Sequence, residues 1–220
     1  MIKNIILAFM LGIMPLSVAC GASLDEQLLD AVKFNDLEKM QKLVKFGASV
    51  NARDKLWGNT TALMYATSHE KFNMVQWLVE NGANVNDIDN DKWTALMYAT
   101  KKGTIKIVKY LLSKGADINA KNENGNNALR IALEYYKWEM AQFLVENGID
   151  INNRNKNGFT ALIYCAKYGK LEMVKYLVSK GADLNVKNDN GETAFMIALN
   201  NGNLEIAEFL ESVGADTTRE

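Results

Sequence analysis

The sequence of 220 residues predicts a mainly α-helical solenoid, built from about six stacked helix-turn-helix repeats that β-hairpin-like loops join. One observation behind this prediction is a Thr-Ala-Leu motif that recurs every 33 residues, with Asn for Thr or Phe for Leu in single copies. Its copies begin at Thr61, Thr94, Asn127, Thr160 and Thr193. A second observation is a glycine that recurs every 33 residues after a first interval of 35. It stands at Gly47, Gly82, Gly115, Gly148, Gly181 and Gly214.

Apolar residues between these markers predict two short helices in each repeat. In the copy that begins at Thr94 they follow helical spacing, which Gly103 interrupts. One repeat cannot bury such a stripe alone, so neighbouring repeats must stack. We also expect an aromatic register in the core, one position before a repeated leucine. It consists of Trp77, Tyr110, Phe143, Tyr176 and Phe209.

The recurring glycine predicts where each second helix ends. A glycine there supplies the positive φ of a helix C-cap, and Asn- or Asp-rich segments such as 122–125 then turn the chain back as a hairpin tip. Two extra residues lie between Gly47 and Thr61. They place Leu56, Trp57 and Gly58 in a tip that is longer and more apolar than the others.

The two ends of the predicted repeat domain, residues 24–220, have the features of caps. Residues 24–53 lack a preceding hairpin and a Thr-Ala-Leu motif, so they form a truncated capping repeat. Full repeats follow at about 54–87, 88–120, 121–153 and 154–186, and a C-terminal capping repeat at 187–218. In that last repeat Glu208 and Glu211 give a polar outer face, which ends the stack.

These markers resemble the ankyrin repeat, whose first helix opens with Thr-Pro-Leu-His and whose second helix is followed by Gly-Ala-Asp-x-Asn. The resemblance covers residues 24 to 218. It departs from the family in two ways, since Ala replaces Pro throughout and other residues replace His. The His positions hold Met64, Met97, Arg130, Ile163 and Met196. Without that His, helix starts should depend on the Thr hydroxyl, with Asn127 serving in the third copy. The resemblance implies a protein-binding module that contacts partners through its hairpin tips and the exposed side of its first helices.

Residues 1–22 look like a secretory signal. Lys3 precedes a run of about ten apolar residues, and small residues follow Pro15. The apolar run is too short to span a bilayer core, which requires about 20 residues. Leu16–Cys20 resembles the lipobox of bacterial lipoproteins, although Ser17 stands where Leu is usual. An acyl chain on Cys20 would anchor the protein to a membrane, and this is the one membrane contact that we expect. Ordinary cleavage after Ala19 or Ala22 is the alternative. We expect an exported protein, either periplasmic or lipid-anchored to the cell envelope.

The composition and the small number of reactive side chains argue against several functions. Acidic and basic residues nearly cancel, 26 against 25, so nothing indicates binding to nucleic acid. The single histidine, His69, falls at a position that we expect to be exposed, which leaves no partner for a catalytic Ser or Cys. Cys165 stands where other repeats have Ala and is expected to be a small buried residue without a disulfide.

Other familiar sites are missing from the sequence. The acidic segment Asp87–Asp91 lacks the spacing of an EF-hand, so we interpret its members as solvated turn residues. Neither a phosphate-binding loop nor a zinc-ligand spacing occurs. We therefore expect no cofactor, no metal and no catalytic residues.

Large aromatic and basic residues at turn and exposed helix positions form our hypothesis for a partner-binding site. Aromatics at such positions have no obvious core to fill and are typical interface anchors. The candidates are Trp57, Trp93, Lys101, Lys102, Tyr135, Phe159, Lys167 and Tyr168. The alternative is that the tip aromatics pack on neighbouring hairpins.

The function that we predict is a non-enzymatic interaction module or scaffold in the bacterial cell envelope. Its partner would be a protein or peptide with some acidic character. A regulator or inhibitor of an envelope enzyme is a subtype of this prediction, and a structural, membrane-anchored protein is an alternative. An enzyme built on the solenoid would need a titratable cluster that the sequence lacks.

Overall fold

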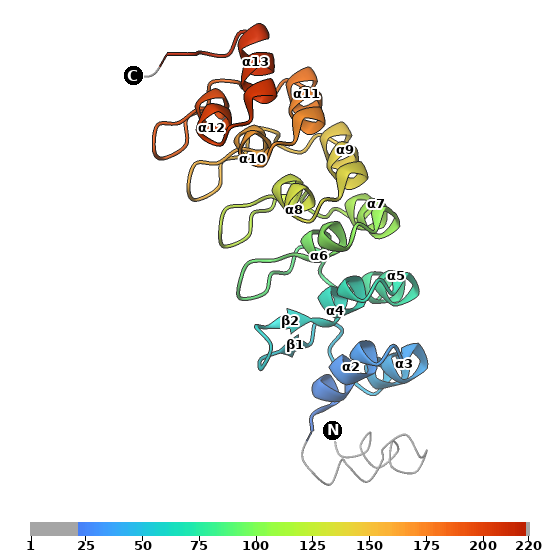
Figure 1. Ribbon diagram of the computed structural model, residues 1–220. Helices are drawn as coiled ribbons and strands as arrows, with labels where there is room; N and C mark the ends of the chain where they lie inside the picture. Colours follow the sequence, from blue (N-terminus) through green and yellow to red (C-terminus); the bar gives the residue numbers. More distant parts are fainter. Residues whose placement is uncertain (1–21, 219–220) are drawn as a thin grey trace. The chain divides into compact units, whose positions relative to one another are not determined.

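The computed structural model describes residues 22–218, so the predicted lipidation site Cys20 and nearly all of the predicted signal peptide lie outside the described residues. The described part contains twelve helices and one two-stranded ladder (Figure 1). It divides into two compact units, and each is described by itself. The first unit comprises residues 22–102 and 106–116, and the second comprises residues 103–105 and 117–218.

The first unit is built from three helix pairs and one hairpin. Its helices are α2 (Leu24–Lys33), α3 (Leu37–Lys45), α4 (Ala62–Ser68), α5 (Phe72–Glu80), α6 (Ala95–Lys102) and α7 (Ile105–Ser113). The hairpin strands β1 (Arg53–Asp54) and β2 (Thr60–Thr61) pair antiparallel just before α4. The first helix of each pair packs on the next, α2 on α4 and α4 on α6. The predicted stacking of repeats is confirmed within this unit.

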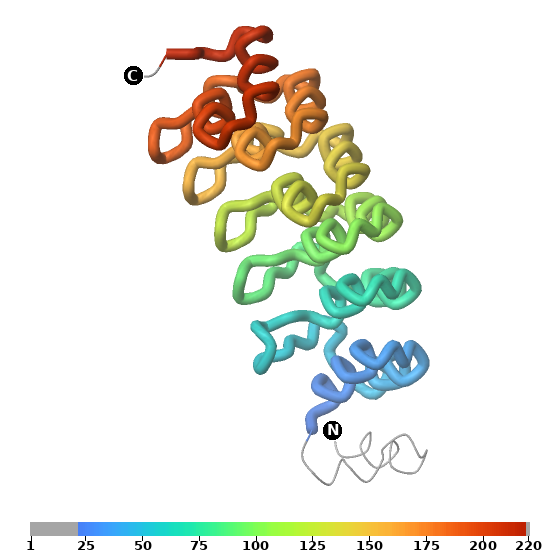
Figure 2. Tube along the Cα trace, viewed as in Figure 1, coloured from blue at the N-terminus to red at the C-terminus, as the bar shows by residue number. Residues whose placement is uncertain are grey.

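The second unit repeats the same plan. Its helices are α8 (Ala128–Glu134), α9 (Trp138–Glu146), α10 (Ala161–Lys167), α11 (Leu171–Ser179), α12 (Ala194–Asn200) and α13 (Leu204–Ser212). Here α8 packs on α10 and α10 on α12, while α11 packs on α13 (Figure 2). Glu208 and Glu211 on α13 are exposed, as the prediction of a polar outer face requires.

Helix starts and ends follow the predicted chemistry. The Thr61 hydroxyl accepts the N–H of Met64 at 3.3 Å, and the same bond recurs at the other Thr positions. Asn127 accepts the N–H of Arg130 at 3.1 Å and so replaces Thr in α8. Gly82, just after α5, has a φ of 93°, a conformation that L side chains rarely adopt. The sequence markers therefore coincide with helix caps.

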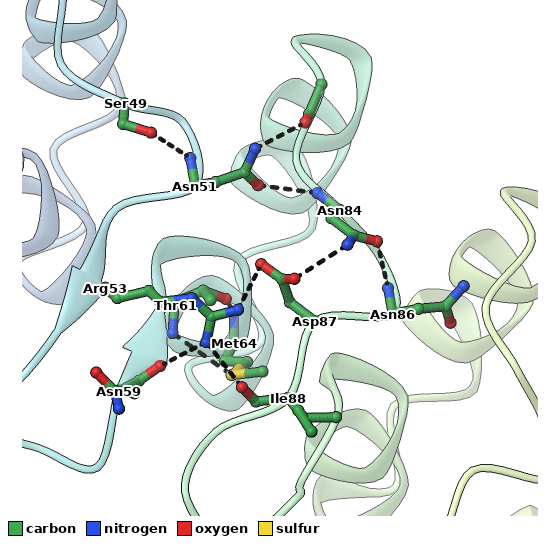
Figure 3. A network of polar contacts seen from close by, with 11 residues as sticks. Ser49, Asn51, Arg53, Asn59, Thr61, Met64, Asn84, Asn86, Asp87 and Ile88 are labelled. Atoms are coloured by element: carbon green, nitrogen blue, oxygen red, sulfur yellow. Dashed lines mark hydrogen bonds and ion pairs between the residues drawn. The ribbon is translucent and has the colours of Figure 1, made fainter.

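Asparagine side chains connect consecutive repeats. Asn51 accepts the N–H of Asn84 at 2.9 Å and donates to the carbonyl of Gly82 at 3.2 Å (Figure 3). In the second unit, Asn152 accepts the N–H of Asp183 at 2.9 Å in the same register. Within the described residues no hairpin precedes the first repeat, and there the Asp25 carboxylate accepts the N–H of Ser49 at 2.7 Å. One carboxylate on α2 thus takes the role that an asparagine has at the later repeats.

The expectation that the aromatic register of the second helices lies in the core is wrong. All five residues, Trp77, Tyr110, Phe143, Tyr176 and Phe209, are half-buried. The leucine that follows each of them is fully buried, as Leu78 and Leu111 show. The hydroxyls of Tyr110 and Tyr176 donate to the carbonyls of Gln76 and Gln142, at 3.4 and 3.3 Å, so each ring bridges to the preceding repeat at the edge of the core.

Candidate partner-binding site

Each hairpin tip is shaped by one Asp or Asn side chain at its start. At Asp89, Oδ1 accepts the N–H groups of Asp91 and Trp93, at 2.9 and 2.8 Å. Such an Asx turn fixes the backbone direction just before the first helix. The same position holds Asp54 and Asp89 in the first unit and Asn122, Asn155 and Asn188 in the second. The backbone N–H of Trp93, and likewise that of Phe159, is therefore held by its own hairpin.

In the first unit the second oxygen of this carboxylate accepts a tyrosine hydroxyl. Tyr98 donates to Asp89 Oδ2 at 2.7 Å, and Tyr65 donates to Asp54 Oδ2 at 3.0 Å. Burial raises the pKa of both tyrosines, and the bonded carboxylates raise it further. The interpretation of the Asp87–Asp91 segment as solvated turn residues is therefore wrong for Asp89, which is buried beneath Tyr98. At these two positions the hairpin is tied to the helix that follows it.

Four predicted site residues lie in the first unit, and they differ in exposure. Trp57 is 70% exposed at the tip of the first hairpin. Trp93 is half-buried, with its ring 5.3 Å from that of Tyr98, and Lys101 Nζ lies 5.6 Å from the Trp93 ring. Lys102 is exposed at the end of α6. We call Trp57, Trp93, Lys101 and Lys102 the first-unit group.

The other four predicted residues lie in the second unit, and three of them come together. Lys167 Nζ lies 5.5 Å from the Phe159 ring and 5.6 Å from the Tyr168 ring. Tyr168 and Lys167 are exposed, whereas Phe159 is half-buried. Tyr135, at the end of α8, is 38% exposed. We call Tyr135, Phe159, Lys167 and Tyr168 the second-unit group.

Two residues that sequence reasoning missed complete the second-unit group. Tyr164 lies with its ring 4.5 Å from that of Tyr168, and the Arg130 guanidinium stacks 3.4 Å from the Tyr164 ring. Arg130 also pairs with Glu134 at 3.4 Å. It occupies the position where the ankyrin pattern has His, so the departure from the pattern was the available signal. These contacts join two cations and three aromatic rings, which belong to Arg130, Lys167, Phe159, Tyr164 and Tyr168.

Other exposed apolar residues were also missed. Phe34 is 82% exposed at the end of α2, in the same register as Tyr135 and Tyr168, so the period alone would have found it. Tyr136 is 60% exposed and has a φ of 56°, which is rare for an aromatic residue. Its ring faces Lys170 Nζ at 4.9 Å.

The two side chains considered for catalysis, those of His69 and Cys165, differ in exposure. His69 is exposed, as expected, and Cys165 is fully buried, with burial raising the pKa of its thiol to about 12. Among the described residues, no three His, Cys, Asp or Glu side chains gather where they could hold a metal ion. Helices in this part of the chain are too short or too polar to cross a membrane.

Stacked helix pairs, Asx-anchored hairpins and exposed rings at a fixed period define a helical repeat protein. A family model described as ankyrin repeats in three copies matches residues 28–122 and again residues 129–220. The chain therefore belongs to the ankyrin-repeat family. Ankyrin repeats generally mediate protein–protein interaction, and the family is typically non-enzymatic.

Proposed function

We propose that this protein is exported and acts in the bacterial cell envelope as a binding module for an acidic region of a protein or peptide. The observation that carries the proposal is the position of the exposed Lys167, whose ammonium lies 5.5 Å from the Phe159 ring and 5.6 Å from the Tyr168 ring. Aromatic rings supply the buried area of a hot spot, and a neighbouring lysine selects a carboxylate. Trp93 and Lys101 repeat this combination in the first-unit group.

A capture experiment from the native cell envelope tests the binding role. The Trp93→Ala, Phe159→Ala double variant should lose its partner, with a fall in affinity of about thirty-fold, which corresponds to about 2 kcal/mol. The matched control is Trp77→Ala, Phe143→Ala, which removes the same two residue types from half-buried positions on the second helices. Equal capture by both double variants would place the binding surface elsewhere. The identity of the captured protein then separates a scaffold from a regulator or inhibitor of an envelope enzyme.

The proposed location rests on the leader, which lies outside the described residues. Mass spectrometry of the mature N-terminus tests it. A diacylglyceryl mass on Cys20 supports anchoring to a membrane, whereas an unmodified chain that begins at Cys20 or Ser23 supports release into the periplasm. A chain that still begins at Met1 in the native cell would contradict export.

A further inference from the structure

Within each unit, peptide groups at the hairpin tips link neighbouring hairpins. The N–H of Asn90 donates to the carbonyl of Gly58 at 2.8 Å in the first unit. In the second unit, Lys156 donates to Asn124 at 2.9 Å and Asp189 to Asn157 at 3.2 Å. Every donor is the residue directly after the Asx residue that starts its hairpin. The tips therefore form short edges that pair with each other one bond at a time.

The first hairpin has this donor but no hairpin before it in the described chain. By register its donor is Lys55, which follows Asp54, and no hydrogen bond of the Lys55 N–H is found within residues 22–218. The space on that side is a groove of about 600 Å³ between α2 and the hairpin. Its lining includes Glu26, Leu29, Asp30, Lys55, Leu56 and Trp57. An unpaired edge that faces a groove is a template for an extended chain.

Charges in the groove favour a positively charged occupant. Lys33 lies between two carboxylates, 2.7 Å from Asp54 and 3.7 Å from Asp30. The lining carries four carboxylates against three cations, and one of the cations, Arg53, pairs at 3.0 Å with Asp87, which lies outside the lining. The carboxylates are those of Asp25, Glu26, Asp30 and Asp54.

The tip of the hairpin supplies an apolar wall for the same occupant. Leu56 is 90% exposed and Trp57 is 70% exposed, although both are large apolar residues. An exposed indole face attracts a lysine or arginine side chain, and carboxylates nearby strengthen that preference.

We propose that this groove binds an extended, positively charged segment of a partner protein. A carbonyl of the segment accepts the Lys55 N–H, and one of its cationic side chains lies between Trp57 and the carboxylates of Glu26 and Asp30. The surface is distinct from the first-unit and second-unit groups except for Trp57. Its occupant has the opposite charge to the partner proposed for those groups.

A substitution at Lys55 separates the backbone donor from the side chain. Residues 54–57 form a turn in which the N–H of Trp57 reaches the carbonyl of Asp54 at 3.2 Å, and Lys55 holds its second position, where proline is favoured. Lys55→Pro therefore removes the N–H while the turn is kept, and Lys55→Ala removes only the side chain. Lys55→Ala should leave the affinity for a positively charged segment unchanged or slightly higher, because it removes a positive charge from the groove.

The test titrates the ¹⁵N-labelled mature chain with an acetylated, amidated Lys-Val-Lys-Val-Lys peptide and with its Glu-Val-Glu-Val-Glu counterpart. We expect the lysine peptide to shift the amide signals of residues 55–58 and the Trp57 indole signal, and the glutamate peptide not to. Lys55→Pro should weaken binding at least five-fold relative to Lys55→Ala. Glu26→Gln with Asp30→Asn should weaken it at least three-fold and reduce its dependence on salt.

Controls fix the site and its independence from the proposed function. Two separate control variants should leave binding of the lysine peptide unchanged. One is Glu38→Gln on α3, and the other is the Trp93→Ala, Phe159→Ala double variant. Equal affinities of the two Lys55 variants, equal binding of the two peptides, or shifts confined to other residues would overturn the proposal. Self-association that the Glu26→Gln, Asp30→Asn variant abolishes would assign the groove to a second copy of the chain and would also overturn it.

Discussion

Tyr98 donates its hydroxyl hydrogen to Asp89 Oδ2 across 2.7 Å, while the Trp93 ring packs against the Tyr98 ring at 5.3 Å. The same carboxylate holds the backbone N–H of Trp93 through Oδ1. One buried Asp therefore positions both the helix tyrosine and the candidate binding residue. The Asp89–Tyr98 hydrogen bond joins the hairpin tip to α6 beside the candidate residue Trp93.

Tyr98→Phe removes this bond without changing the ring. The change leaves a buried carboxylate oxygen without its donor, so we expect the free energy of unfolding to fall by about 1–3 kcal/mol. Urea denaturation measures it. Tyr164→Phe is the matched control, because Tyr164 occupies the same register in α10 and no hydrogen bond of its hydroxyl is found among the described residues. Equal losses in the two variants would contradict this account.

Asp54→Asn tests the charge at the equivalent position of the first hairpin. Burial raises the pKa of Asp54, but hydrogen bonds from Lys33 and Tyr65 outweigh it and hold the pKa below its usual value. A carboxyl group with a lowered pKa stabilises the fold above its unfolded pKa, about 3.9, and this contribution disappears as pH falls through the folded pKa. We expect Asp54→Asn to lower the free energy of unfolding by about 1.5–3 kcal/mol at pH 7.

The pH dependence is the diagnostic part of that experiment. The difference between wild type and Asp54→Asn should stay constant from pH 7 to about 5 and shrink as the pH falls below about 4. The second unit shows that Asn can form the same turn, since Asn155 Oδ1 accepts the N–H groups of Asn157 and Phe159 at 3.0 and 2.9 Å. The variant therefore changes the charge and leaves the Asx turn in place. A difference that is unchanged at pH 3 would show that charge is not its cause.

Thr160→Ala tests the helix caps that replace the missing histidine. The Thr160 hydroxyl accepts the N–H of Ile163 at 3.3 Å and is buried at the start of α10. Loss of such a cap costs about 0.5–2 kcal/mol. Thr160→Ser keeps the hydroxyl and should retain most of the stability, apart from a lost methyl group. Thermal unfolding of both variants measures the difference, and equal destabilisation would assign the effect to packing rather than to the cap.

Repetition explains which parts of the fold could be predicted from the sequence. The period of 33 residues placed the Thr caps and the positive-φ glycine that follows each second helix, because each of these roles depends on one residue type at one local position. The half-burial of Trp77 and its equivalents could not be obtained in this way. Helical spacing shows which residues share a face, but how far the adjoining repeat covers that face depends on tertiary packing.

The candidate site was predicted as a set of positions, without its internal contacts. Phe159 and Lys167 are eight residues apart and meet across a hairpin-to-helix turn, while Arg130 meets Tyr164 from the preceding repeat. Asp89 was misread because an Asp-rich tip looks solvated until the helix tyrosine nine residues later is seen to cover it. Contacts of this kind depend on three-dimensional proximity, which a linear pattern does not contain.

Cys165 provides the last prediction, and it tests how rigid the second unit is. The thiol is fully buried on α10, and burial raises its pKa to about 12, so the reactive thiolate is scarce at pH 8. In a Cys20→Ser background, a thiol reagent should react with the native chain at least a hundred-fold more slowly than with the chain in urea, because reaction requires local opening. Cys165→Ala should lower the free energy of unfolding by less than about 1 kcal/mol, since Ala fills this register in the other repeats. Cys165→Ser buries a hydroxyl and should lower it by about 1–3 kcal/mol. Rapid labelling of the native chain would mean that α10 opens readily, and the surface formed by Phe159, Lys167 and Tyr168 would then be assembled by the partner rather than presented to it.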